Sequence, residues 1–156
     1  MNYRIENKLI WLTRILIGGV TFLNIQCALA FLISPQSYSA GFDLSGAHGE
    51  AVIRSLGILF LMWNVPYVVA LWNPVSYYMS LVEAVIMQSI GVMGESLLLW
   101  RTPQLSEVVK ESVIRFILFD SIGWVALVLA LGIVQWIKAR KFSQSYKRQE
   151  DEQKSR

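Results

Sequence analysis

Four long stretches of mostly apolar residues alternate with short polar breaks along this chain. They cover residues 9–33, 51–72, 75–100 and 113–137. A helix of about 20 predominantly apolar residues crosses the hydrocarbon core of a bilayer, so each stretch is long enough to span it. We therefore predict an all-α fold in which residues 9–137 form a single four-helix transmembrane bundle with an antiparallel, up-and-down arrangement.

Turn-forming residues mark the breaks between these stretches. Pro35 follows the first stretch, Asn73 and Pro74 separate the second from the third, and Pro103 follows the third. Proline cannot continue a helix, and it disfavours helical backbone in the residue before it. The two-residue break predicts a tight hairpin between the second and third helices. Ser106 is expected to cap the start of the fourth helix.

Pro66 lies inside the second stretch and interrupts its pattern. Because proline has no backbone N–H, it leaves the carbonyl near Met62 without its helical donor and is expected to kink the helix. Asn64, two residues earlier, either satisfies that carbonyl or lines a cavity.

Composition supports a lipid environment and removes several functional classes. The chain is 54% hydrophobic and only 16% charged. Its one cysteine, Cys27, excludes internal disulfides, CxxC redox pairs and cysteine zinc sites, and its one histidine, His48, excludes a bis-histidine haem within one chain. We see no nucleophile–base pair, metal set or cofactor motif, so we expect no metal, no cofactor and no catalytic residues.

Basic residues are concentrated near the two ends of the chain. Arg4 and Lys8 precede the first apolar stretch, and seven of the fourteen Lys and Arg residues lie after residue 137, whereas residues 34–49 contain none. Lys and Arg in short flanks stay on the cytoplasmic side of a membrane. We therefore expect residues 1–8 and the basic, then acidic, tail 138–156 to be cytoplasmic.

These features predict a multi-pass protein of a bacterial cytoplasmic membrane whose environment is the lipid bilayer. The uneven net charge of +3 is a signal of topology, so we expect no nucleic-acid partner. A cleaved signal peptide is the competing interpretation of the first stretch, because a basic start and Ala28-Leu29-Ala30 resemble that pattern. The apolar run of residues 9–33 is longer than the 7 to 15 residues of a usual signal-peptide core.

Seven ionisable side chains fall inside the predicted spans or at their mouths. Insertion scales put the cost of one charge at the centre of a membrane helix at about 2.5 to 3.5 kcal/mol, so such groups face the bundle interior, pair, reach the interface or lose their charge. The seven are Arg14, Glu50, Arg54, Glu83, Glu95, Arg115 and Asp120.

Depth in the membrane predicts which of these groups meet. Arg14 of the first helix and Glu83 of the third lie at similar depths near the cytoplasmic edge and are expected to form a structural ion pair. Toward the outer side, the directions of the helices predict one polar cluster, which is the candidate ligand-binding set. Its members are Glu50, Arg54, Gln88, Glu95, Arg115 and Asp120.

The seven ionisable groups together contain one more acid than base. Four acids face three arginines, and we expect Asp120 or Glu95 to carry a proton at neutral pH, because desolvation favours the uncharged form of a carboxyl. Two interpretations stay open. Either the buried charges fix the register of the helices, or they form a ligand or proton site that opens to the outer side.

Two short motifs carry a resemblance, the first to the DoxX-like family of small membrane proteins and the second to related four-helix families. The first stretch contains LTRILIGGVTFL, with Arg14 four residues before Gly18, and the second contains AVIRSLGILFLMW, with Arg54 three residues before Gly57. The resemblance implies a four-helix membrane bundle. It also implies an association, in some relatives, with membrane oxidoreductase assemblies or with quinone-linked and oxidative-stress functions.

Two hypotheses of function follow, and a membrane enzyme is the least favoured third. The first is an accessory or assembly subunit of a membrane complex, whose partner is another membrane protein or a second copy of the chain. The alternative is a binder or carrier of a lipophilic or anionic small molecule. In the alternative, Arg54 and Arg115 contact an anion, and Glu95 or Asp120 titrates. A cavity enclosed by these residues would favour the alternative, and a solid, fully paired cluster would favour the first.

Overall fold

The structure, a computed structural model, contains helices and no strands in the part of the chain that it describes. It covers residues 3–154, with side chains described except at residues 3, 146–148 and 151. The elements in chain order are α1 (Tyr3–Ile33), α2 (Gln36–Ser39), the 3-10 helix η1 (Ala40–Phe42), α3 (Gly46–Trp63), α4 (Val65–Trp72), α5 (Tyr78–Arg101) and α6 (Glu107–Lys154).

Within residues 3–154, four segments are long and apolar enough to cross a membrane. They are Arg4–Ile33 in α1, Gly46–Trp72 across α3 and α4, Tyr78–Arg101 in α5 and Glu107–Ser145 in α6. Their number, length and composition confirm the prediction of four spans and indicate a multi-pass integral membrane protein.

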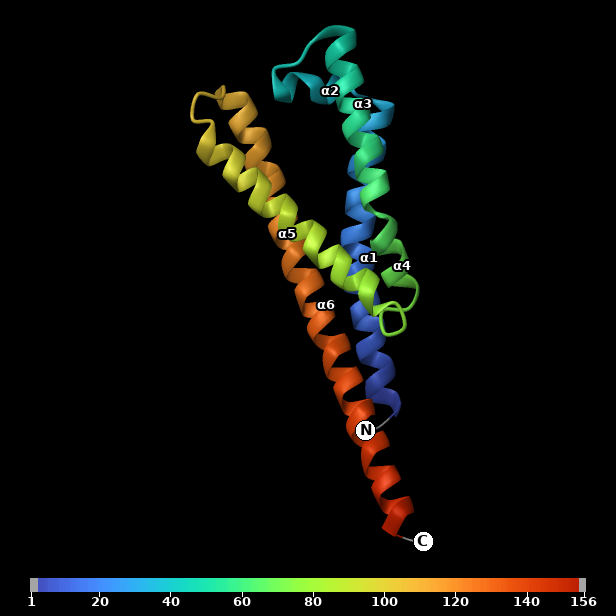
Figure 1. Cartoon of the computed structure of the whole chain (residues 1–156). Coiled ribbons are helices and arrows are strands. Elements are labelled where there is room, and N and C mark those ends of the chain that lie inside the picture. Colours follow the sequence, from blue (N-terminus) through green and yellow to red (C-terminus); the bar gives the residue numbers. More distant parts are fainter. Residues whose placement is uncertain (1–2, 155–156) are drawn as a thin grey trace.

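The last helix is longer than the apolar pattern predicts. α6 contains 48 residues and is therefore roughly 72 Å long at 1.5 Å of rise per residue. Figure 1 shows its C-terminal part extending well beyond the other helices. Lys141 forms an ion pair with Glu6 of α1, and Lys154 pairs with Glu150 one helical turn away at 2.8 Å. The Glu150–Lys154 pair, four residues apart on one helix, supports helix where apolar periodicity is absent.

The second span is broken between α3 and α4, as Pro66 predicts. Asn64 lies at the break, and its Nδ2 donates a hydrogen bond to the carbonyl of Phe60 at 2.7 Å. The asparagine thus satisfies a backbone carbonyl at the break, although it is Phe60's and not that of Met62. The hairpin that follows is equally local, because Asn73 Oδ1 accepts hydrogen bonds from two backbone N–H groups two and three residues later.

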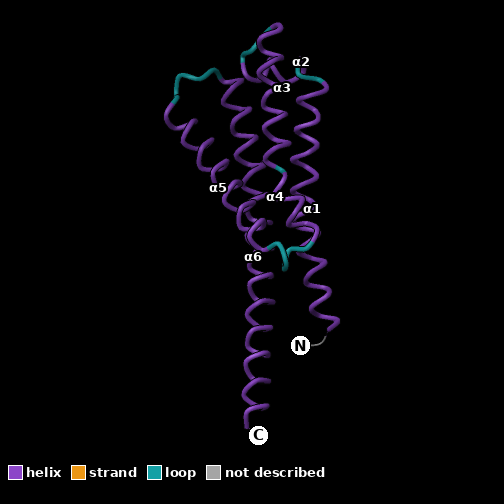
Figure 2. Tube along the Cα trace, turned by 45° about the vertical axis from the view of Figure 1, so that its right-hand side comes forward, coloured by secondary structure: helices purple, strands orange, loops and turns teal. Residues whose placement is uncertain are grey.

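α1 is the central helix of the arrangement. It packs against α3, α4 and α6, while α5 packs along α6 and against α4. The main apolar core lies in the half of the molecule near the α4–α5 hairpin, where Ile17, Tyr67, Leu81, Leu127 and Val134 are fully buried. Farther from this hairpin, α5 and the start of α6 lean away from α1 and α3 (Figures 1 and 2).

A group of aromatic rings bridges the helices at this more open end. Phe31 of α1 lies 4.9 Å from Tyr38, 5.8 Å from Phe60 and 6.2 Å from Phe116, measured between ring centroids. Phe116 also faces Phe42, at 6.1 Å. Such ring pairs stabilise contacts beyond the area they bury. They therefore join α1, α2, η1, α3 and α6 at one end of the molecule.

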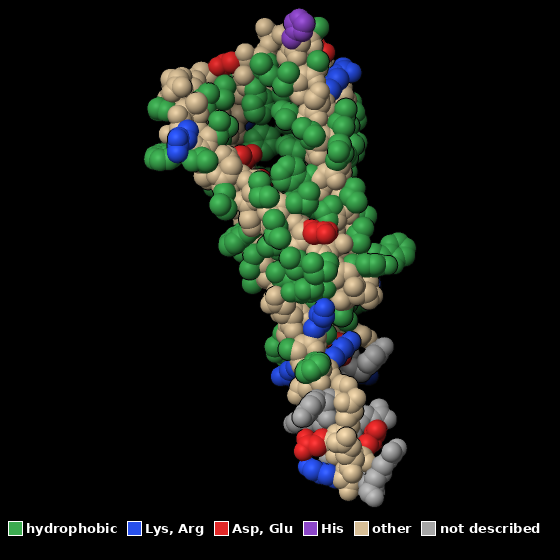
Figure 3. All heavy atoms as spheres, viewed as in Figure 1, with side chains coloured by type: hydrophobic (Ala, Val, Ile, Leu, Met, Phe, Trp, Pro, Cys, Tyr) green, Lys and Arg blue, Asp and Glu red, His purple; other side chains and the backbone are tan. Residues whose placement is uncertain are grey.

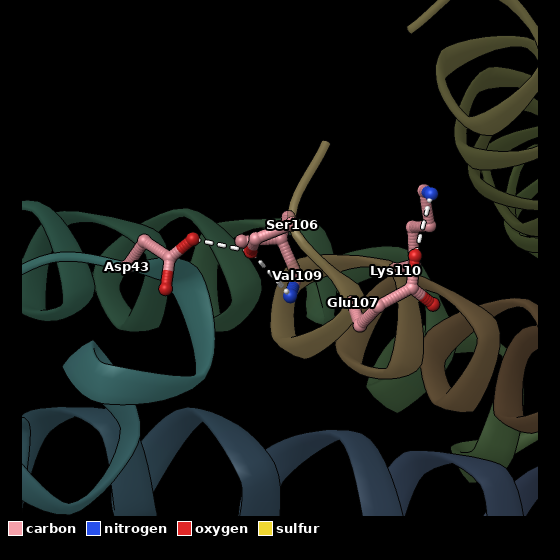
Figure 4. A network of polar contacts seen from close by, with 5 residues as sticks. All are labelled: Asp43, Ser106, Glu107, Val109 and Lys110. Carbon is pink, nitrogen blue, oxygen red and sulfur yellow. Dashed lines mark hydrogen bonds and ion pairs between the residues drawn. The ribbon is translucent and has the colours of Figure 1, made fainter. Parts of the chain in front are cut away.

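The start of α6 is fixed by the predicted cap. Ser106 Oγ accepts a hydrogen bond from the backbone N–H of Val109 at 3.3 Å and also contacts the carboxylate of Asp43, which follows η1 (Figure 4). Glu107, in the first turn, pairs with Lys110 at 2.8 Å. The cap therefore ends the loop before α6 and ties that loop to the connection between α1 and α3.

Candidate functional site

A cavity of about 260 Å³ lies between the helices, in the region where α5 and α6 diverge from α1 and α3. The space-filling view shows a hollow on this side of the molecule, rimmed by hydrophobic side chains (Figure 3). All four spans contribute to its wall. The polar lining comes from Asn24 of α1, Asn64 between α3 and α4, Gln88 and Glu95 of α5, and Asp120 of α6.

The rest of the wall is dominated by aromatic rings. Five of them line the cavity: Phe60, Trp63, Tyr67, Phe116 and Phe119. Phe60 and Phe116 belong to the aromatic group described above, so this group forms one end of the cavity. A small space with apolar walls and a few converging polar groups is typical of a ligand site.

A chain of hydrogen bonds crosses the cavity wall from α4 to α6. The hydroxyl of Tyr67 donates to Gln88 Oε1 at 2.6 Å, and Gln88 Nε2 donates to Asp120 Oδ1 at 2.9 Å and to the Asp120 carbonyl at 3.2 Å. Gln88 is only 4% exposed. Since a hydroxyl donates to its oxygen, the amide of Gln88 is oriented with its nitrogen toward Asp120. The carboxyl of Asp120 is thus held in place from α5.

Two glycines make room for this chain of hydrogen bonds. A Cβ at Gly91 would lie 2.5 Å from Asp120 Oδ2, and a Cβ at Gly123 would lie 3.0 Å from Gln88 Nε2. The side chains of Asp120 and Gln88 therefore occupy space that any larger residue at these two positions would fill. This explains both glycines through packing, as in other membrane helix contacts that use small residues.

Two buried acceptor atoms on the cavity wall have no hydrogen-bond partner among the described residues. They are Glu95 Oε2 and Asn64 Oδ1. Asn64 is only 3% exposed, and its other polar atom, Nδ2, is already bonded to Phe60. Buried polar atoms are normally satisfied, so two unsatisfied acceptors on one cavity wall indicate that something else supplies their donors.

The structure brings together three of the six predicted site residues and separates the others. Gln88, Glu95 and Asp120 line the cavity, whereas Glu50, Arg54 and Arg115 do not. Glu50 and Arg54 form a pair at 3.7 Å whose side chains are 40% and 54% exposed. Arg115 is 75% exposed and pairs with Glu111 at 3.4 Å.

Angular position around a helix explains why Arg115 is absent from the cavity. The prediction used depth alone, but five residues at about 100° each place Arg115 about 140° around α6 from Asp120. A shared depth therefore does not give a shared face. The two arginines of the predicted outer cluster, Arg54 and Arg115, thus lie outside the cavity, and the cavity is acidic.

The predicted inner ion pair is also absent among the described residues. Arg14 Nη2 donates to the carbonyl of Trp72 at 2.6 Å, and its guanidinium lies 5.4 Å from the ring of Trp11. Glu83 is exposed on α5. Arg14 instead satisfies a carbonyl at the end of α4, where the last helical carbonyls have no donor within the helix.

Sequence reasoning did not identify Tyr67 or the aromatic wall. Tyr67 is fully buried and follows Asn64 by three residues, which places the two side chains on one face across the helix break. A tyrosine within an apolar span needs a hydrogen-bond partner for its hydroxyl, and this was the available signal. No sequence signal marks the aromatic wall, because phenylalanines in membrane helices face lipid as readily as they face a cavity.

Comparisons of the chain with protein-family models, with curated proteins and with solved structures find no match. The wall of the cavity combines two carboxyls, unsatisfied oxygen acceptors and aromatic faces, and no Lys, Arg or His is among the described residues that line it.

Proposed function

We propose that this membrane protein binds, and in that way carries, a small lipophilic molecule in the cavity between its four spans. The observation that supports this is the cavity itself, which all four spans line with aromatic rings and a few polar groups. Its volume of about 260 Å³ lies just below the range of about 300 to 1,000 Å³ for sites of drug-sized ligands. The occupant is accordingly small.

The polar groups favour a ligand site over a purely structural role. Buried groups that only fix the register of helices are expected to satisfy one another. Here Gln88 and Asp120 do so, whereas Glu95 Oε2 and Asn64 Oδ1 face a cavity without a partner among the described residues. Unpartnered acceptors on a cavity wall therefore favour a ligand-binding role over a purely structural one.

An experiment with a fluorinated hydrocarbon tests the proposal. The protein in phosphatidylcholine nanodiscs is titrated with 4-fluoroneopentylbenzene, and its ¹⁹F resonance is recorded. We expect a protein-bound resonance distinct from that of probe dissolved in lipid. Cys27→Trp, which fills the cavity from α1, should abolish it, whereas Leu29→Trp, at a 43% exposed position of the same helix, should leave it unchanged. Equal signals from the two variants would refute the proposal, as would the absence of a bound resonance both from this hydrocarbon and from a charged probe of the same shape.

We also propose that the spans alternate in direction and that both termini are cytoplasmic in a bacterial cytoplasmic membrane. Both marked ends of the chain lie toward the same end of the molecule in Figure 1, and both carry basic flanks. In a Cys27→Ser background, a cysteine at Ser143 should react with an impermeant maleimide only after permeabilisation, and one at His48 should react without it. The reverse pattern would overturn this topology.

One observation favours a second candidate, the accessory subunit. Glu83 is exposed within the α5 span and has no ion pair or hydrogen bond among the described residues. A lipid-facing carboxylate is costly, and a basic side chain of another membrane protein would compensate it. The DoxX-like resemblance, which we retain as a proposal, points to assemblies of this kind. If so, Glu83→Gln should reduce the size of the native complex extracted in mild detergent, and an unchanged size would exclude this role for Glu83.

A further inference from the structure

We infer that the occupant of the cavity is a hydrophobic cation, an organic ammonium with apolar substituents. This inference rests on the proposed function, namely that the cavity holds a small molecule. The occupant is then a cation, and not the anion that the predicted cluster of arginines suggested.

The charged groups around the cavity favour a positively charged occupant. Glu95 and Asp120 both line it, and neither has an ion pair with a basic residue among the described residues. The two outer arginines, Arg54 and Arg115, are each engaged with a glutamate on their own helix and are more than half exposed. An anion in the cavity would thus meet two acids and no base, whereas a cation would compensate them.

The hydrogen-bond acceptors on the cavity wall favour the same kind of occupant. Asn64 Oδ1 and Glu95 Oε2 have no donor among the described residues. The donors closest to the carboxyl of Asp120 are already used, since the Tyr67 hydroxyl bonds to Gln88 and the Gln88 amide bonds to Asp120. A ligand that carries positive charge or N–H donors matches these acceptors, and one with only acceptors does not.

The aromatic rings of the wall favour an organic cation over an inorganic one. Five rings line the cavity, contributed by α3, α4 and α6, so they approach an occupant from more than one side. The face of an aromatic ring attracts a cation, and cages of several rings recognise quaternary ammonium groups. An inorganic cation needs a full set of oxygen ligands instead, and no cluster of three or more metal-binding side chains occurs among the described residues. Rings and carboxyls together therefore favour an organic cation.

Three fluorinated probes of similar shape test the inference on the full-length protein. They are 4-fluorobenzyltrimethylammonium, its uncharged carbon isostere 4-fluoroneopentylbenzene, and the anion 4-fluorophenylmethanesulfonate. Their affinities are measured by ¹⁹F resonance in nanodiscs of uncharged phosphatidylcholine, so that lipid charge does not select among them. We expect the cation to bind at least about tenfold more tightly than the isostere, a ratio that one desolvated cation–π contact supports, and the anion not to bind.

Conservative variants locate the source of this preference. Glu95→Gln and Asp120→Asn are each expected to weaken binding of the ammonium by at least about tenfold, because a charge pair inside a protein is screened less than one in bulk water. Both variants should leave the affinity for the isostere unchanged. Glu83→Gln removes an exposed carboxyl from the same helix as Glu95, outside the cavity, and should alter neither affinity.

The outcomes separate this inference from the proposed function. If the isostere binds as well as the ammonium, or better, the cavity holds lipophilic molecules but the inference of a cation is wrong. If no probe gives a bound resonance, both proposals fail. The three probes are compared on the unchanged protein. The outcome of this comparison therefore does not depend on whether any variant folds.

Discussion

Gly91 provides the sharpest test of the buried polar arrangement. An added Cβ at this position would lie 2.5 Å from Asp120 Oδ2, closer than real Cβ contacts allow, whereas a Cβ at Gly94 on the same helix would meet nothing within 4 Å. In Gly91→Ala, the carboxyl of Asp120 must therefore move. Because Gln88 holds Asp120 Oδ1 at 2.9 Å, that movement weakens the hydrogen bond between α5 and α6.

The expected size of the effect follows from hydrogen bonds within membranes. Side-chain hydrogen bonds between membrane helices contribute about 0.6 kcal/mol on average and up to about 1.7 kcal/mol. Gly91→Ala and Gly94→Ala make the same change of helix propensity within α5, so this contribution cancels in their difference. We expect Gly91→Ala to have a free energy of unfolding lower than that of Gly94→Ala by roughly 0.6 to 1.7 kcal/mol.

Titration of the purified protein with sodium dodecyl sulfate in mixed micelles, followed by tryptophan fluorescence, measures these free energies. The same pair of substitutions is then made in an Asp120→Ala background, where the carboxyl that obstructs the new methyl group is gone. The difference between the Gly91 and Gly94 variants should disappear there. If it persists, or if it is absent in the original chain, the placement of Asp120 against Gly91 is wrong.

Three further outcomes are expected in the same unfolding assay. Gly57→Ala should cost about 1 to 3 kcal/mol, because its Cβ would lie 2.9 Å from a backbone carbonyl of α1; a neutral result would mean that α1 and α3 are farther apart. Ser106→Ala should cost about 1 kcal/mol and Ser45→Ala clearly less, since only Ser106 makes a cap hydrogen bond. The effects of Arg14→Gln and Glu83→Gln on the free energy of unfolding should add within about 0.5 kcal/mol. A larger coupling between them would show that the predicted ion pair forms.

The sequence by itself determined the class of the molecule and its local breaks. Apolar length predicts the four spans, because the thickness of a bilayer sets a minimum that composition alone can test. The cap at Ser106, the turn at Asn73 and the break at Pro66 are also local, because each depends on atoms only two to four residues away. These expectations required no knowledge of how the helices pack.

Local patterns were less informative about the ends of the helices. The apolar pattern of the fourth stretch ends at residue 137, yet α6 continues to Lys154. This polar tail contains strong helix formers and charges spaced by one turn, such as Glu150 and Lys154, so its helix does not depend on an apolar face.

Only the tertiary structure decided which charged groups meet. Rise along the helix predicts depth, and depth correctly placed Gln88, Glu95 and Asp120 within one region. The rotation of each helix about its axis, which depends on packing against its neighbours, turned Arg115 and Glu83 away from the interior and left an acidic, aromatic cavity. A single sequence gives each residue its depth, but the faces of four helices are fixed only when they pack together.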